Sequence, residues 1–129
     1  MNNFSQKSWS SFKYAFKGLQ TFWNCEFNAR IHVGIALIVI IAGIIFRISQ
    51  VEWIIQLLCI AMVIGAEMIN TAFELMIDKW CKEIDATAAK VKDITAGAVL
   101  LNSFIAAIAG ITIYAPKLYD LAVQVFESA

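Results

Sequence analysis

Three long apolar segments constrain this chain more than any other feature. They fall at about residues 31–48, 52–78 and 94–115, and Pro116 is expected to close the third. Each contains an apolar run of about 18–21 residues, which as a helix matches a hydrocarbon core about 30 Å thick. The runs lack the alternation typical of barrel strands, so helices are the only spanning structures left. The sequence therefore predicts an all-α integral membrane protein with three transmembrane helices.

The composition agrees with this fold class. Of the 129 residues, 60% are hydrophobic, whereas soluble domains have about 45–50% apolar residues. The formal charge is zero, with ten basic and ten acidic residues, which argues neither for nor against binding of nucleic acid. The three cysteines lie far apart and show no zinc-site spacing, so we expect no disulfide framework. We see no internal repeat or linker and expect one membrane domain over residues 1–129.

The basic residues predict the orientation in the membrane. Eight of them precede the first segment or lie between the second and third: Lys7, Lys13, Lys17, Arg30, Lys79, Lys82, Lys90 and Lys92. Only Arg47 and Lys117 fall on the other side. Because cytoplasmic loops carry an excess of lysine and arginine, we expect a multi-pass membrane protein with a cytoplasmic N-terminus.

The N-terminal segment, about residues 5–25, has a different pattern. Its apolar stripe is spaced by three and four residues and consists of Trp9, Phe12, Phe16, Leu19 and Trp23. Lys13, Lys17 and Gln20 fall off this stripe. The pattern predicts a basic amphipathic helix on the cytoplasmic membrane surface. The alternative is a helix packed against a soluble partner.

The stretch "GAEMINTAFELMIDKW" (65–80) places polar groups on one face of the second segment. At about 100° per residue, four of them fall within about 60° of Glu67: Asn70, Thr71, Glu74 and Asp78. Glu67 lies about 22 Å into the segment, Glu74 about 33 Å and Asp78 about 39 Å, so the face runs from hydrocarbon into the cytoplasm. A carboxylate at the depth of Glu67 costs a few kcal/mol, and a functional role is the default hypothesis. The alternative is a buried pair that only fixes helix packing.

Other polar residues are expected at the same level. Glu26 precedes the first segment, and Lys92 and Asp93 precede the third. Clustered carboxylates repel one another unless a cation binds them, and Mg²⁺ is commonly bound by one or two carboxylates together with phosphate and water. A nearby lysine suits a phosphate. The residues thus indicate a metal–phosphate site for phosphoryl transfer at the inner membrane face, although neither a GxxxxGK[ST] loop nor protein-kinase motifs are present.

Three motifs resemble one known family. They are "YAFKGLQTFWNCE" (14–26), "EMINTAFE" (67–74) and "KDITAGAVL" (92–100), and they are similar to the prokaryotic diacylglycerol kinase and undecaprenol kinase family of small membrane proteins. The resemblance covers roughly residues 5–115. It implies an ATP-dependent lipid kinase that converts diacylglycerol to phosphatidic acid, or undecaprenol to undecaprenyl phosphate, at the cytoplasmic interface. It also implies a homotrimer in the bacterial inner membrane with composite sites at the subunit interfaces.

The resemblance implies a role for each matching residue. Glu67 would be the general base that takes the proton of the lipid hydroxyl, and Glu26 and Glu74 would hold Mg²⁺ on the phosphates of ATP. The nucleotide and its site would further involve Asn70, Asp78, Lys92, Asp93, Lys7 and Tyr14. Asp85 stands where many members carry a histidine near the nucleotide, which leaves the nucleotide preference open.

The polar face of the second segment also suits two other classes of function. A small oligomeric transporter or channel would use Glu67 as an intramembrane cation or proton site, but the polar path stops at the inner interface. A membrane scaffold would use the polar face only to dock partners. For the kinase, helices of another chain are expected to shield Glu67 from lipid, because three spans cannot enclose a polar cavity.

Overall fold

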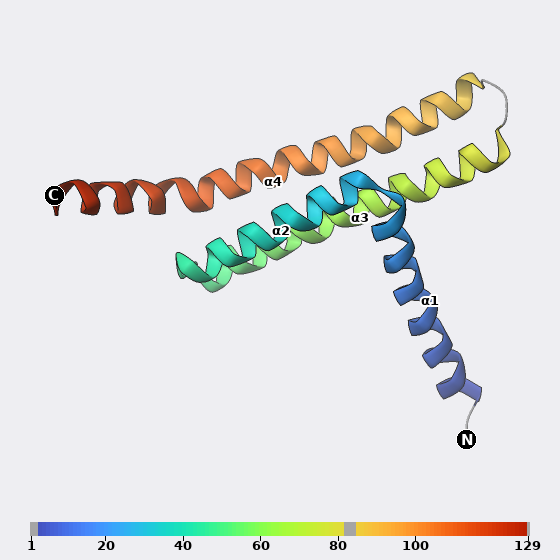
Figure 1. Cartoon of the computed structure of the whole chain (residues 1–129), viewed down its shortest axis with the longest axis horizontal. Helices are drawn as coiled ribbons and strands as arrows, with labels where there is room; N and C mark the ends of the chain where they lie inside the picture. The colour runs from blue at the N-terminus through green and yellow to red at the C-terminus, as the bar shows by residue number, and fades with distance from the viewer. Residues whose placement is uncertain (1–2, 82–84, 129) are drawn as a thin grey trace.

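The computed structural model describes residues 3–81 and 85–128, with side chains from Trp9 onward. Its described part consists of four helices: α1 (Asn3–Cys25), α2 (Phe27–Ile45), α3 (Gln50–Trp80) and α4 (Ala86–Glu127). Helices α2, α3 and α4 are long and apolar enough to cross a membrane. They lie side by side in Figure 1, whereas α1 leaves them at a steep angle. This confirms the prediction of an all-helical chain with three candidate transmembrane helices.

Several helix ends differ from the expected segments: α2 begins at Phe27 rather than at residue 31, and α4 begins at Ala86 rather than at residue 94. Helix α2 ends at Ile45, three residues before the predicted limit, because residues 46–49 form the turn to α3. The expectation that Pro116 closes the third segment is wrong for the helix, since α4 continues through Pro116 to Glu127. A proline removes one backbone donor and need not end a helix whose flanking turns are held by other contacts.

The turn between α2 and α3 is tight and is fixed by three local features. A Cβ atom at Gly43 would lie 2.9 Å from the ring of Trp53, so a larger residue there would force this ring to shift. Arg47 adopts a positive φ of 50°, a region that non-glycine residues visit mainly in turns. Ser49 and Glu52 then form a capping box at the start of α3, which satisfies backbone donors that the first helical turn leaves free.

Helix α1 contacts the bundle only near its C-terminal end in the described structure. Phe22 is buried there, whereas Trp9, Phe12 and Phe16 are exposed. The predicted helix is present, but its position on the membrane surface remains a prediction. A surface that is apolar along one side and free of protein contacts is compatible with that position.

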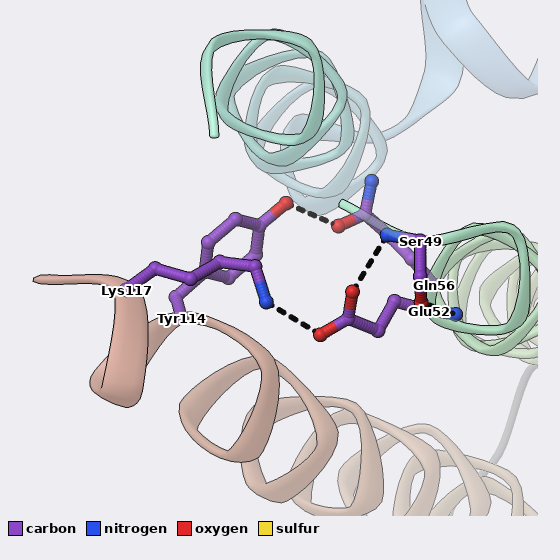
Figure 2. Close-up of polar contacts among 5 residues, drawn as sticks. All are labelled: Ser49, Glu52, Gln56, Tyr114 and Lys117. Carbon is purple, nitrogen blue, oxygen red and sulfur yellow. Dashed lines mark hydrogen bonds and ion pairs between the residues drawn. The ribbon is translucent and has the colours of Figure 1, made fainter. Parts of the chain in front are cut away.

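A network of polar residues joins α3 and α4 next to the turn (Figure 2). This turn-end network comprises Ser49, Glu52, Gln56, Tyr114 and Lys117. Lys117 Nζ lies 2.5 Å from Glu52 Oε1, and the Tyr114 hydroxyl lies 2.5 Å from Gln56 Oε1. The network also reaches α2: Gln56 Nε2 donates to the carbonyl oxygen of Val39 at 3.1 Å, and the Tyr114 hydroxyl lies 2.8 Å from the same oxygen. Three helices are therefore held together at one point.

The network predicts a stability effect of Tyr114→Phe. The variant leaves Gln56 Oε1 buried without the hydroxyl donor, and we expect a loss of about 1 kcal/mol in the free energy of unfolding, in the range measured for hydrogen bonds between membrane helices. The measurement is unfolding in mixed micelles by titration with a denaturing detergent. Tyr119→Phe, at an exposed position of the same helix, is the matched control. Equal effects of the two changes would contradict the prediction.

Candidate active site

The corner between α1 and α2 places Glu26 beside α3. Glu26 has an extended backbone (φ −122°, ψ 129°) and separates the two helices. The pKa of its carboxyl group is raised by partial burial, by the negative charges of Glu74 and Glu67, and by a hydrogen bond with the Glu74 side chain. Three carboxyl groups from two parts of the chain therefore come together at this corner.

Helix α3 presents the predicted polar face to this corner. Glu67, Asn70 and Thr71 are buried, with 3%, 7% and 3% of their surface exposed, and Glu74 is partly buried. Asn70 Nδ2 donates to Glu74 Oε1 at 3.1 Å, which orients that carboxylate toward the cluster. Asn70 Oδ1 is buried and has no hydrogen-bond partner in the described part of the chain. Because buried acceptors are nearly always paired, this atom is an open position within the cluster.

The surroundings of Glu67 correct one expectation. Helices of a second chain were expected to shield Glu67 from lipid, but Glu67 is already 97% buried within this chain. The start of α2 contributes to the shielding, since His32 lies within electrostatic range of Glu67. His32 is therefore a neighbour of the cluster that the sequence pattern did not place there. The only signal was its position at the same depth as Glu67 on the adjacent helix.

Lys92 and Asp78 form an ion pair between α4 and α3 next to the cluster. Lys92 also lies within electrostatic range of Glu74. The structure therefore brings Asp78 and Lys92 to the edge of the cluster. Asp93, the next residue, is exposed.

Tyr14 and Lys7 were also predicted to belong to the nucleotide site, and Asp85 stands where many family members carry a histidine near the nucleotide. Tyr14 is 72% exposed and lies about 18 Å along α1 from Glu26, so the single chain does not bring it to the cluster. The side chain of Lys7 lies outside the described residues. Asp85 caps α4, and the backbone N–H groups of Ala88 and Thr87 lower the pKa of its carboxyl group.

The side-chain oxygen atoms at the corner suit a divalent cation that takes further ligands from elsewhere. Among the described residues, no three histidine, cysteine, aspartate or glutamate side chains are arranged to hold a metal ion by themselves. The corner instead offers two adjacent carboxylates, from Glu26 and Glu74, and the open amide oxygen of Asn70. This donor set fits Mg²⁺, which takes oxygen ligands and usually keeps phosphate and water in its remaining positions.

Comparison with known proteins decides the family. The family model described as prokaryotic diacylglycerol kinase matches residues 13–114. The chain belongs to this family. It is therefore a lipid kinase, that is, a phosphotransferase, and the three apolar helices make it a multi-pass bacterial membrane protein.

Two curated relatives are similar over most of the chain. An undecaprenol kinase of Bacillus subtilis (strain 168) is 34% identical over 108 residues, which cover 84% of this chain and 88% of that protein. A diacylglycerol kinase of Synechocystis sp. (strain ATCC 27184 / PCC 6803 / Kazusa) is 32% identical over 114 residues, which cover 88% of this chain and 65% of that protein. No solved structure matches the chain.

Proposed function

We propose that the protein transfers the γ-phosphoryl group of ATP to the hydroxyl of a membrane lipid alcohol at the cytoplasmic interface. The observation that carries the proposal is the convergence of Glu26, Glu67 and Glu74 where α1, α2 and α3 meet. Undecaprenol is the preferred alcohol and diacylglycerol the alternative. Support for this order comes from the undecaprenol kinase relative, of which the chain covers 88%, against 65% for the diacylglycerol kinase.

The proposed step is a direct transfer. The lipid oxygen forms a bond to the γ-phosphorus, the bond from that phosphorus to the bridging oxygen of ADP breaks, and Glu67 takes the hydroxyl proton. Glu67 suits this role because it is buried and near the inner boundary, where the hydroxyl of a lipid lies. A positioned base of this kind contributes about 10²–10⁴-fold to a rate.

Glu26 and Glu74 would hold Mg²⁺, which when bound would neutralise charge on the phosphates. Asn70 holds Glu74 through its amide N–H and offers Oδ1 to the same site. Lys92 would contact phosphate from the edge of the cluster, where Asp78 positions its ammonium group. Asp93, Lys7 and Tyr14 would belong to the nucleotide site in the assembled protein.

An apolar pocket of about 550 Å³ between α2, α3 and α4 is a place for the lipid tail. His32 lines one end of it and Tyr114 the other, with Val63 and Gly110 between them. Because His32 lies near Glu67, a tail in this pocket would start next to the proposed base. The low polarity of the lining suits an acyl or prenyl chain.

The proposal includes a homotrimer with a cytoplasmic N-terminus and with α1 on the membrane surface. The apolar span of α4 has almost no buried residue within one chain, and Ser103 Oγ is buried there without a partner in the described structure. A neighbouring chain would also bring its α1 and Tyr14 toward the site.

The direct test is an assay of the purified protein in mixed micelles. With Mg-ATP, we expect a phosphorylated lipid from undecaprenol at a higher kcat/KM than from diacylglycerol. A folded protein that phosphorylates neither alcohol would contradict the kinase proposal, and a preference for diacylglycerol would reverse the order of substrates. Cation flux in proteoliposomes without lipid phosphorylation would favour a transporter.

Glu67→Gln is expected to lower kcat at least about 10²-fold, because the amide cannot accept the hydroxyl proton. Folding and ATP binding should change little, since the substitution keeps the shape of the side chain. The measurements are kcat with saturating substrates and ATP affinity by calorimetry. Glu127→Gln, at the exposed end of α4, is the matched control. A kcat near that of the unaltered protein would remove Glu67 from the role of base.

Glu74→Gln is expected to raise the Mg²⁺ concentration needed for half-maximal activity by at least about tenfold, an effect typical of weakened metal sites. The readout is a Mg²⁺ titration at fixed ATP, accompanied by thermal unfolding with and without Mg-ATP. The stabilisation by Mg-ATP should shrink in parallel. An unchanged titration would argue against Glu74 as a ligand.

A further inference from the structure

Helix α4 is much longer than a bilayer requires. Its 42 residues span about 63 Å, roughly twice the hydrocarbon thickness. The Lys117–Glu52 ion pair and the turn between α2 and α3 mark one end of the bundle. In Figure 1 the C-terminal end of α4 continues alone past this turn. Residues 118–127, here called the C-terminal segment, also lie beyond the family match, which ends at residue 114.

The C-terminal segment is amphipathic with a narrow polar stripe. Asp120, Gln124 and Glu127 follow Lys117 at intervals of three, four and three residues, which confines all four to a sector of about 80°. The other positions are apolar and comprise Leu118, Tyr119, Leu121, Ala122, Val123, Val125 and Phe126. More than half of the helix circumference is therefore apolar.

This apolar face has no protein cover in the described chain. Tyr119 is 70% exposed, Val125 59% and Phe126 83%. The segment continues α4 and so needs no new helix nucleus, but its valine and aromatic residues have only moderate helix propensity. An apolar surface against the segment would supply the missing stabilisation.

We propose that the C-terminal segment binds the adjoining membrane surface and places its apolar face at the boundary between lipid headgroups and acyl chains. We assign the bilayer as the partner of this apolar face because the segment begins at the edge of the bilayer. Its covalent attachment to the spanning part of α4 keeps the segment close to this surface and so gives it a high effective concentration there. To reach the membrane, the helix would bend around Pro116, whose missing N–H leaves the hydrogen-bond ladder of α4 weakest at this edge. The stripe of Lys117, Asp120, Gln124 and Glu127 faces water.

Spin-label accessibility tests this placement. Single cysteines at residues 118–127 are introduced after replacement of Cys25, Cys59 and Cys81 by alanine, and each is labelled with a nitroxide in phosphatidylcholine nanodiscs. Accessibility to oxygen, which is enriched in lipid, is compared with accessibility to a water-soluble nickel chelate. A label at Leu101, exposed within the span, calibrates the lipid signal. We expect a helical period, with the oxygen preference severalfold higher at 119 and 126 than at 120, 124 and 127.

Two results would overturn the proposal. A uniform preference for the nickel chelate would show that the segment stands in water. Low accessibility to both reagents at 119 and 126 would show that protein, such as a second copy of the chain, covers the face. As a matched pair in the same background, Phe126→Asp should reduce the oxygen preference of a label at 119, whereas Gln124→Asp should leave it unchanged. Equal effects of these two substitutions would also contradict the proposed orientation.

Discussion

Hydrogen bonds within the chain decide where its polar residues can lie, because hydrocarbon offers no partner to an unsatisfied donor or acceptor. Gln56 meets this requirement through the carbonyl of Val39 and the hydroxyl of Tyr114. Thr71 meets it on its own helix by donating to the backbone carbonyl of Glu67 at 2.9 Å. Asn70 meets it only in part: its amide N–H is bonded to Glu74, whereas Oδ1 is open. The exception lies among the carboxylates, which is where the proposed function requires a free ligand atom.

Two polar contacts fix α4 against α3 from opposite ends. The turn-end network holds one end through Tyr114 and Lys117, and the ion pair of Lys92 with Asp78 holds the other. Slippage of α4 by one helical turn, about 5.4 Å, would break both contacts at once. The network near the turn therefore contributes to the position of Lys92 beside the carboxylates, although the two are separated by most of the span. The hydrogen bond from Gln56 to the carbonyl of Val39 also fixes the position of α2 against α3, and the corner at Glu26 lies directly before α2.

The features predicted from sequence are those that belong to a single helix. Hydropathy alone gave the three spans, and the period of α3 placed Glu67, Asn70 and Glu74 on one face before any contact was known. The pairs between helices, such as Gln56 with Tyr114, depend on how the helices cross, and residues 58 positions apart in sequence carry no local signal of that crossing. The shielding of Glu67 was misjudged for the same reason, since it depends on the corner that brings α2 against α3. The capping box of Ser49 and Glu52 did have a sequence signal, the S-x-x-E pattern.

The charge balance at the corner connects stability with function. Glu26, Glu67 and Glu74 lie within electrostatic range of one another, and Lys92, which lies within range of Glu74, is already paired with Asp78. Burial and this repulsion raise the pKa of Glu26, so the folded state binds a proton there more readily than the unfolded chain does. The contribution of Glu26 to stability is therefore largest at low pH and is lost as the pH rises through its raised pKa. A bound cation would remove the repulsion that drives this loss, so under the proposed function the arrangement that weakens the protein alone would favour a metal–phosphate ligand. Functional sites commonly trade stability for activity in this way.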